Sequence, residues 1–348
     1  MKRTRTSSRK QQHVEFVVQK DVVFRRKQTG FERWEFAHNA LPEIDFSEVN
    51  PATKFLGVPV RLPILVSSMT GGYADALRIN RQLAEVCAEK QLPMGVGSQR
   101  QALEDGRFHR SFAVVREVSK NIPVYGNIGA AEVAKLTDAA PIQRMVDLIE
   151  ANGFAVHVNP LQELLQPEGN PEFRGVLKGI ELLVKRLSIP VIVKEIGAGI
   201  SAAAAKKLID IGVRIIDVAG AGGTSWAGVE ILRRKKSEHS ALTSAFWNWG
   251  IPTATALQQV SELKKHQTNL KLIASGGITS GVDAAKALAM GADYVAIARP
   301  ILRALELGGK KRLFRLLDQW EFELRGVMFL TGAATIADLQ HQQLTRVE

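Results

Sequence analysis

Residues 157–163 read HVNPLQE and gather four side chains able to do chemistry directly after an apolar segment, residues 153–156. The four are an imidazole, two amides and a carboxylate, from His157, Asn159, Gln162 and Glu163. A loop that only reverses the chain does not need these groups, whereas proton transfer or the binding of an anion or a cation does. The segment is therefore the first candidate site. The helices and strands around it determine which other side chains lie close to it.

Short apolar segments alternate with helical segments from residue 62 onward. Several apolar segments are rich in β-branched residues, which is typical of strands buried on both faces. The predicted strands are Leu62–Ser67, Met94–Gly97, Val124–Asn127, Phe154–Val158, Val191–Lys194, Ile215–Val218, Leu272–Ser275 and Tyr294–Ile297. The predicted helices include Ala74–Glu89, Ile142–Ala151, Val176–Leu187, Ala202–Ile211 and Val282–Met290.

Eight strands with following helices predict a TIM (β/α)8 barrel over residues 62–348. An N-terminal extension or cap, residues 1–61, precedes it, and we expect this part to be irregular. A doubly wound open sheet is the alternative, although eight such units close more naturally into a barrel. The loop after the sixth strand, residues 224–251, is longer than ordinary connections and is a candidate lid or site loop.

The chemistry of a barrel lies at the C-terminal ends of its strands, and all eight predicted ends carry polar or glycine-rich sequence. Turn chemistry alone would explain the glycines but not Arg100, His157 or Lys194. The residues that we single out at these ends, besides HVNPLQE, are Ser68, Met69, Thr70, Ser98, Gln99, Arg100, Asn127, Lys194, Thr224, Gly276, Gly277, Ile278, Ala298 and Arg299. Together they predict one polar pocket.

The seventh and eighth strands give the most specific signal. Residues 274–299 place Gly276 and Gly277 at a strand end, then a helix, then a strand that ends in Ala298-Arg299. Barrels commonly bind phosphate between these two loops, with bare backbone N–H groups and a helix N-terminus. The segment is similar to the phosphate-binding segment of barrels that hold flavin mononucleotide, FMN.

Lys194, at the end of the fifth strand, supports a flavin independently. A buried lysine is costly unless an anionic group meets it, and an ammonium beside the flavin N1/O2 edge would stabilise the anionic reduced ring. An ion pair with Glu195 is the alternative. Alternation along the strand points these two neighbours to opposite faces, which favours the flavin.

Composition narrows the class of protein. The chain has 348 residues, 45% of them hydrophobic, a net charge of +11 and a single cysteine, Cys87. No apolar run reaches the roughly 18 residues that span a bilayer, and one cysteine permits neither an internal disulfide nor a cysteine-based zinc site. The N-terminus is rich in Arg and Ser, as organelle transit peptides are, but it lacks the apolar segment of a secretory signal, so we expect a cytoplasmic protein.

The positive charge predicts an anionic partner. Five of the first ten residues are basic, and further basic runs occupy residues 233–236 and 310–312. Nucleic acid, a membrane surface and a small polyanion would all suit this charge. No signature of a nucleic-acid-binding module accompanies it, and aromatic residues make up only 6% of the chain, so nucleic acid is the least favoured of these partners and a small polyanion such as a diphosphate stays open.

At this point the sequence resembles the type 2 isopentenyl-diphosphate isomerases, which depend on FMN, over nearly the whole chain. One departure is Ala219, where relatives often have a serine near the flavin, so one expected hydrogen bond is missing. The landmarks are Arg9-Lys10 with His13, Met69-Thr70-Gly71-Gly72, Gly97-Ser98-Gln99-Arg100, HVNPLQE, Val193-Lys194-Glu195, Gly222-Gly223-Thr224-Ser225-Trp226 and the glycine pair of the seventh strand.

The resemblance implies a set of roles. Isopentenyl diphosphate and dimethylallyl diphosphate would be interconverted at reduced FMN, with NADPH serving only to reduce the flavin. The protein would be a homo-oligomer, a tetramer or an octamer. FMN would be bound by the strand-end residues named above, except Gln99 and Arg100. Glu163 would hold Mg²⁺ on the diphosphate, and catalysis would involve Gln162, His157 and Glu230. The substrate-binding residues implied are Arg9, Lys10, Ser98, Gln99, Arg100, His157, Asn159 and Gln162.

Two other functions are weighed against the isomerase. A flavin-dependent α-hydroxy-acid oxidase would need a His and an Arg near the seventh strand, and residues 272–276 contain neither. An inosine-monophosphate dehydrogenase would need a cysteine after the sixth strand, whereas Cys87 falls in a predicted helix, where it is expected to pack in the core. A polyanion-binding protein without catalysis would leave the eight polar strand ends unexplained.

Overall fold

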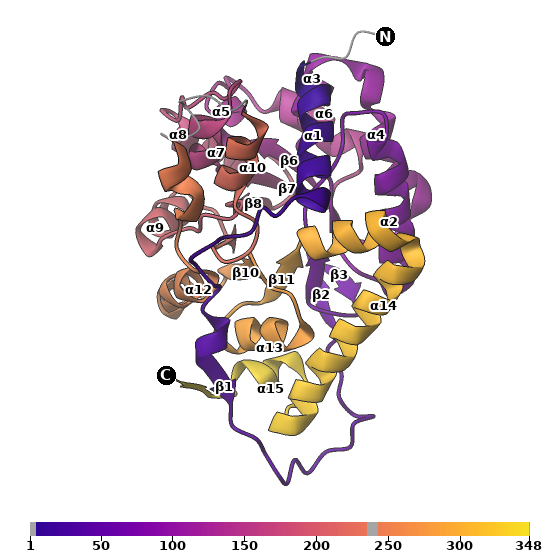
Figure 1. The fold of residues 1–348 in the computed structure, drawn as a ribbon, viewed down its shortest axis with the longest axis vertical. Coiled ribbons are helices and arrows are strands. Elements are labelled where there is room, and N and C mark those ends of the chain that lie inside the picture. Colours follow the sequence, from indigo (N-terminus) through magenta and orange to yellow (C-terminus); the bar gives the residue numbers. More distant parts are fainter. Residues whose placement is uncertain (1–4, 235–242, 348) are drawn as a thin grey trace.

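The computed structural model describes residues 5–234 and 243–347 and shows a closed barrel of eight parallel strands (Figure 1). Each strand pairs with the next along the chain, and the eighth pairs with the first. Every predicted strand agrees within two residues, so the predicted TIM barrel is confirmed. The strands are β4 (Ile64–Val66), β5 (Met94–Gly95), β6 (Val124–Gly129), β7 (Gly153–His157), β8 (Val191–Lys194), β9 (Ile215–Asp217), β10 (Lys271–Ser275) and β11 (Tyr294–Ile297).

A helix follows each strand and packs on the outside of the barrel, as predicted from the helical segments of the sequence. These helices are α2 (Ala76–Lys90), α4 (Arg110–Val118), α6 (Ala140–Leu148), α8 (Val176–Arg186), α9 (Ala202–Asp210), α12 (Thr253–Ser261), α13 (Gly281–Ala289) and α14 (Arg299–Thr331). Shorter helices lie in the connections: α3 (Arg100–Glu104), α5 (Ala130–Val133), α7 (Pro160–Leu165), α10 (Trp226–Arg233) and α15 (Ile336–Gln340), with the 3₁₀ turns η1 (Phe31–Arg33), η2 (Gly106–Phe108), η3 (Ala245–Asn248) and η4 (Glu262–His266).

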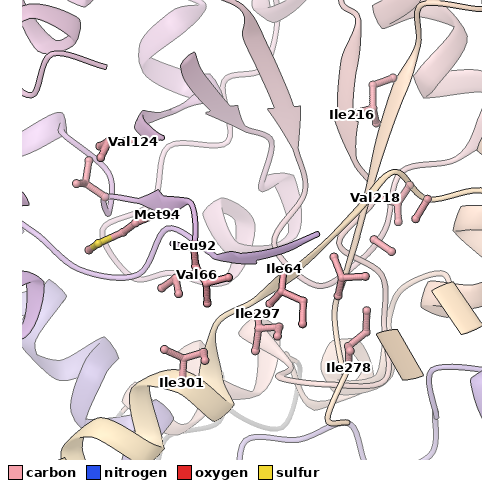
Figure 2. Close-up of a cluster of buried hydrophobic side chains, with 14 of the residues drawn as sticks. Ile64, Val66, Leu92, Met94, Val124, Ile216, Val218, Ile278, Ile297 and Ile301 are labelled. Carbon is pink, nitrogen blue, oxygen red and sulfur yellow. The ribbon is translucent and has the colours of Figure 1, made fainter. Parts of the chain in front are cut away.

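Side chains alternate between the inside and the outside of the barrel. Ile64 and Val66 of β4 point outward and pack, with Met94 and Ile297, toward Ile301 of α14 (Figure 2). The inward set forms a separate cluster of Leu65, Tyr125, Ala155, Ile192, Ile273 and Ala296 with Phe55. The barrel centre is therefore a packed core and not a pore.

A hairpin of the N-terminal extension closes one end of the barrel. It consists of β2 (Thr53–Phe55) and β3 (Val58–Val60), and the Tyr294 hydroxyl, at the start of β11, donates to the Lys54 carbonyl at 2.7 Å. The plugged end is the N-terminal end of the strands, so ligands must enter at the opposite end.

The extension is not irregular throughout, which corrects the expectation for residues 1–61. Helix α1 (Arg5–Gln19) lies over the C-terminal end of the barrel, against α10 and α14 (Figure 1). Its first half is polar, so the helical period is weak in the sequence, and its stability comes from tertiary contacts. Strand β1 (Trp34–Phe36) pairs antiparallel with β12 (Leu344–Arg346), which ties the extension to the C-terminal segment.

Three further features concern the predictions. Cys87 is fully buried in α2, as expected, and burial raises the pKa of its thiol to about 12. The predicted long loop contains α10 and η3, but residues 235–242 lie outside the described residues, so a lid is not tested. Within the described ranges, no helix has both the length and the apolar character needed to traverse a bilayer.

Candidate active site

Two adjoining cavities lie at the C-terminal end of the barrel. The large cavity has a volume of about 1010 Å³ and the small cavity one of about 140 Å³. The side chains that line both are His13, Ser68, Met69, Lys194, Ile196 and Trp226. A ligand in one cavity would thus lie against a ligand in the other.

Most of the predicted cofactor residues line the large cavity. These are Ser68, Met69, Lys194, Thr224, Gly276, Gly277, Ile278, Ala298 and Arg299. Thr70, Ser98 and Asn127 line the small cavity instead. Small-molecule pockets span about 300–1,000 Å³, so the large cavity can hold a cofactor of flavin size.

The two glycines after β10 lie so close to neighbouring backbone that a residue with a side chain would not fit at either position; we call this glycine pair the cradle. Gly276 and Gly277 have φ angles of 98° and 75°, a region that L-residues rarely adopt. A Cβ atom on Gly276 would lie 2.1 Å from the Gly220 carbonyl oxygen, and one on Gly277 would lie 2.4 Å from Thr29. The N–H groups of Gly281 and Asp283 at the start of α13 already donate to Glu323 and Ser280, so the bare backbone of the cradle, with the start of α14 after β11, is the part that fits the phosphate of FMN.

Lys194 has an anionic neighbour that the sequence did not single out. Its Nζ donates to the Glu195 carbonyl at 2.7 Å and lies 3.7 Å from Oδ2 of Asp217, at the end of β9. Ser275 donates to the other Asp217 oxygen at 2.6 Å. Burial nevertheless raises the pKa of Asp217, against the opposing effects of Lys194 and Ser275.

The alternative ion pair between Lys194 and Glu195 does not form. The Glu195 carboxylate turns away and accepts the backbone N–H groups of four successive residues, Ile196–Gly199. Strand alternation separated the two side chains as expected. Lys194 lines both cavities, where its Nζ can donate to a ligand.

The HVNPLQE segment forms one wall of the small cavity. His157 ends β7, and Pro160 begins α7, where its missing N–H has no effect on the helix. Asn159 Nδ2 donates to Gln162 Oε1 and to Glu163 Oε1, both at 3.0 Å.

His157 is uncharged at neutral pH. Burial lowers the pKa of His157 to about 3, and the charges of Lys194, Arg9 and Lys10 act in the same direction. Its Nδ1–H donates to Asn127 Oδ1 at 2.9 Å. The remaining nitrogen, Nε2, therefore accepts a hydrogen bond and supplies no positive charge.

Cations from two elements line the opposite side of the small cavity. Helix α1 contributes Arg9 and Lys10, and α3 contributes Arg100, which pairs with Glu132 at 3.2 Å. Lys10 Nζ donates to the carbonyls of Gly71 at 2.8 Å and Ser98 at 2.5 Å. Burial, reinforced by the charge of Arg9, lowers the pKa of Lys10 to about 7.

Four residues that line the small cavity, Arg9, Ser68, Asn159 and Gln166, each have a buried side-chain atom without a hydrogen-bond partner among the described residues. Arg9 Nε is an unpaired donor and Asn159 Oδ1 is an unpaired acceptor. Glu163 lies beside Asn159 and also accepts the Asn170 N–H at 2.7 Å. The described residues include no group of three His, Cys, Asp or Glu that could hold a metal alone. A cation here would be coordinated by one protein carboxylate, by phosphate oxygens and by water, as is usual for Mg²⁺.

Glu230 lies behind the small cavity and contacts it through Gln162. Gln162 Nε2 donates to Glu230 Oε1 at 3.1 Å, and His13 Nε2 lies 2.8 Å from the same oxygen. Burial alone would raise the pKa of Glu230, but His13, Arg233 and Gln162 together lower it. The Glu230 carboxylate is therefore ionised at neutral pH, and it accepts the hydrogen bond that fixes the Gln162 amide.

Sequence reasoning missed His13 as a site residue. It lines both cavities and packs edge-on against Trp226, with ring centroids 5.2 Å apart. The spacing of Arg9, Lys10 and His13 would place them on neighbouring parts of a helix surface, but no helix was predicted there.

Two predicted residues are placed differently from the rest. The structure does not bring Gln99 to either cavity: its side chain is buried, with Nε2 donating to Met145 O at 3.1 Å and Oε1 accepting from Asn127 N at 3.2 Å. Its side chain thus connects the Met145 carbonyl to the Asn127 N–H at the end of β6. Arg299 lines the large cavity, but its guanidinium donates to two carbonyls at the end of α1.

Comparison with solved structures agrees with this fold. A mandelate oxidase variant with a monooxide FMN adduct has a TM-score of 0.63 at 18% identity, covering 92% of this chain and 90% of that chain. The variant with (S)-mandelic acid has a TM-score of 0.66 at 17% identity, covering 97% of this chain and 94% of that one. At such identities the likeness concerns the fold alone.

Sequence relatives are much closer. An isopentenyl-diphosphate delta-isomerase of Pelodictyon phaeoclathratiforme is 48% identical over 351 residues, covering 98% of this chain and 97% of that protein. Proteins of the same name from Chlorobaculum parvum and Pseudescherichia vulneris are 46% and 42% identical, covering 99% and 100% of this chain and 98% and 99% of their own lengths. A family model described as FMN-dependent dehydrogenase matches residues 2–110 and 162–346. The chain therefore belongs to the FMN-dependent dehydrogenase family and, within it, to the isopentenyl-diphosphate delta-isomerases.

Proposed function

We propose that this enzyme interconverts isopentenyl diphosphate and dimethylallyl diphosphate, with FMN in the large cavity and the diphosphate in the small one. The observation that carries the proposal is the shared wall of a flavin-sized cavity and a cavity lined by cations. A diphosphate among Arg9, Lys10 and Arg100 would leave the hydrocarbon end toward Lys194 and Trp226, where the two cavities meet.

The chemistry needs one proton added and another removed, with no net transfer of electrons. When bound in its reduced form, FMN would supply an acid–base group and an electron-rich ring beside the alkene. Gln162 lines the small cavity and is held at both ends, by Asn159 and by Glu230, so its amide has a fixed orientation. Glu230 and His13 share a hydrogen bond and could hold a proton between them.

We also propose Mg²⁺ as a partner of the diphosphate, held by Glu163. The unpaired Oδ1 of the neighbouring Asn159 supports it, because a hard cation takes oxygen ligands. The neutral His157, with Nε2 as an acceptor, suits a hydrogen bond from a metal-bound water better than one to a phosphate oxygen. Mg²⁺ there would neutralise the diphosphate charge that the basic residues leave.

Four further proposals follow from the resemblance and the composition. NADPH would reduce the flavin, and the protein would work in the cytoplasm as a homo-oligomer, a tetramer or an octamer. Its partner would be a small diphosphate, with neither nucleic acid nor a membrane involved. The gathering of Arg9, Lys10 and Arg100 around one small cavity supports the small anion.

The experiment that tests this function offers the purified FMN-bound protein two substrates. Under anaerobic conditions and with chemically reduced flavin, isopentenyl diphosphate should yield dimethylallyl diphosphate. With oxidised flavin, an α-hydroxy acid such as mandelate should not bleach the flavin spectrum. Bleaching by mandelate without isomer formation would replace the isomerase with an oxidase.

The pH profile of kcat/KM should follow the protonation of Lys10. Protonated Lys10 attracts the diphosphate, and its pKa is lowered to about 7 by burial, so kcat/KM should fall as pH rises through about 7. Lys10→Arg keeps its charge and should move this alkaline limb to higher pH. Profiles of kcat/KM for both proteins decide, and an unmoved limb in the variant would show that another group titrates.

The midpoint reduction potential of bound FMN should depend on Lys194. Lys194→Ala removes the positive charge and leaves Asp217, 3.7 Å from the former ammonium, without its counter-charge. Both changes disfavour an anionic reduced flavin, so the midpoint potential should drop by about 30–60 mV, or one to two factors of ten for a two-electron couple. A potentiometric titration measures this, and an unchanged potential would remove Lys194 from the neighbourhood of the ring.

A further inference from the structure

Arg299 joins two elements that are far apart in the sequence. It is the first residue of α14, directly after β11 and Ala298. Its Nε donates to the Val17 carbonyl at 3.0 Å, and its Nη2 donates to the Lys20 carbonyl at 3.1 Å. These carbonyls belong to the last turn of α1 and the residue after it, where helices have unpaired acceptors.

The last turn of α1 contains no basic residue, and the Lys20 that follows it is exposed. The Arg299 guanidinium donates directly to the terminal carbonyls and so adds the positive charge that favours a helix C-terminus. A charge-assisted pair of hydrogen bonds from one planar guanidinium also fixes the direction of the helix end. The helix end is thereby attached to the barrel strand that precedes α14.

The same helix carries residues of both cavities. Val17 lines the large cavity, while Arg9 and Lys10 line the small one. Arg9 lies eight residues before Val17, or about 12 Å along a helix at 1.5 Å per residue. A small tilt of α1 at Val17 would therefore displace Arg9, whose buried Nε has no protein partner.

Other contacts also hold α1: near its C-terminal end Val17 and Val18 are buried in the core, and residues 22–24 pair with residues 223–225. Lys10 donates to two carbonyls, and Gln12 accepts from Arg233. Without Arg299 this end would keep its apolar packing but lose the two directional hydrogen bonds to its terminal carbonyls. Apolar packing is not directional, so the helix axis could tilt and shift its anion-binding residues.

We propose that Arg299 is a positioning residue, which sets the diphosphate-binding side chains of α1 by holding the C-terminal end of that helix. The inference deepens the proposed function and rests on it for the identity of the anion. It differs from the sequence expectation, in which Arg299 is a ligand of the FMN phosphate.

The test compares Arg299→Gln with Arg303→Gln in the FMN-bound protein. Arg303 lies one turn further along α14 and lines the same large cavity, but it makes no hydrogen bond to α1 in the described structure, so its variant removes one positive charge from that cavity without releasing α1. With Mg²⁺ present, Arg299→Gln should bind inorganic diphosphate about 10-fold more weakly by calorimetry, as expected for loss of a helix-end cation. Arg303→Gln should bind it as the wild type does.

Two more readouts separate positioning from a general loss of structure. Hydrogen exchange should speed up in residues 10–19 in Arg299→Gln, and Arg299→Lys should restore part of the protection. With reduced flavin, KM for isopentenyl diphosphate should rise about 10-fold while kcat changes little. FMN should stay bound.

Two results would overturn the proposal. One is unchanged exchange in α1, whatever happens to diphosphate binding. The other is loss of FMN with α1 still protected, which would make Arg299 a cofactor ligand. If the wild type neither binds diphosphate nor isomerises, the proposed function fails, and the exchange result alone still decides whether Arg299 holds α1.

Discussion

Replacing Glu163 with glutamine should lower kcat/KM on the order of 100-fold at a fixed Mg²⁺ concentration, because even outer partners of a metal site are worth about 10–100-fold. An amide is a weak ligand for Mg²⁺, whereas a carboxylate beside the unpaired Asn159 oxygen is a suitable one. The half-maximal Mg²⁺ concentration should rise in parallel. FMN should remain bound, because Glu163 does not line the large cavity.

The measurement is activity against Mg²⁺ concentration for the wild type, Glu163→Gln and Glu132→Gln. Glu132 lines the same small cavity and pairs with Arg100, so its variant removes one negative charge without touching the proposed metal ligand. Its Mg²⁺ dependence should match that of the wild type. Equal shifts in the two variants would mean that Glu163 acts only through the charge of the cavity.

The oxidation state of the flavin should have the largest effect of all. Oxidised protein should be on the order of 10²–10⁴-fold slower than reduced protein with isopentenyl diphosphate, the range that general acid–base catalysis contributes. The physical reason is that an oxidised ring has neither the basic site nor the electron density that the alkene shift needs. Anaerobic titration of activity against the fraction of reduced flavin should give a straight line through zero.

The barrel could be predicted from the sequence because its signals are local. Strands buried on both faces read as apolar β-branched segments, and β8 and β11 were predicted residue for residue. Helix α1 could not be predicted in this way. Its polar first half, including Arg9 and Lys10, becomes helical because of what it contacts across the barrel.

The candidate site shows the same division. Barrel geometry brings strand ends together, so Lys194, His157 and Gly276 could be assigned in advance to the same end of the barrel, where the structure has two adjoining cavities. Where each side chain points depends on its neighbours: Gln99 turns inward to hold Asn127, and Arg299 turns outward to α1. Their residue types suited a ligand equally well, so only the packed structure separates them.

Partners from other strands were missed for a related reason. Asp217 ends β9 and meets Lys194 of β8 through strand pairing, and His13 meets Glu230 from a helix 217 residues away in sequence. Each contact depends on register and on helix placement. The sequence alone does not give this register, so it can indicate which polar groups are buried but not which of them pair.

The central claim is that protons move while no electrons are consumed, and one measurement in D₂O tests it directly. The protein is reduced once with a limiting amount of dithionite, under anaerobic conditions and without NADPH, and isopentenyl diphosphate is added in large excess. The account predicts many turnovers per flavin, a flavin that stays reduced, and deuterium in the dimethylallyl diphosphate, because the added proton comes from a group that exchanges with solvent. A single turnover per reduced flavin, or a product free of deuterium, would contradict it.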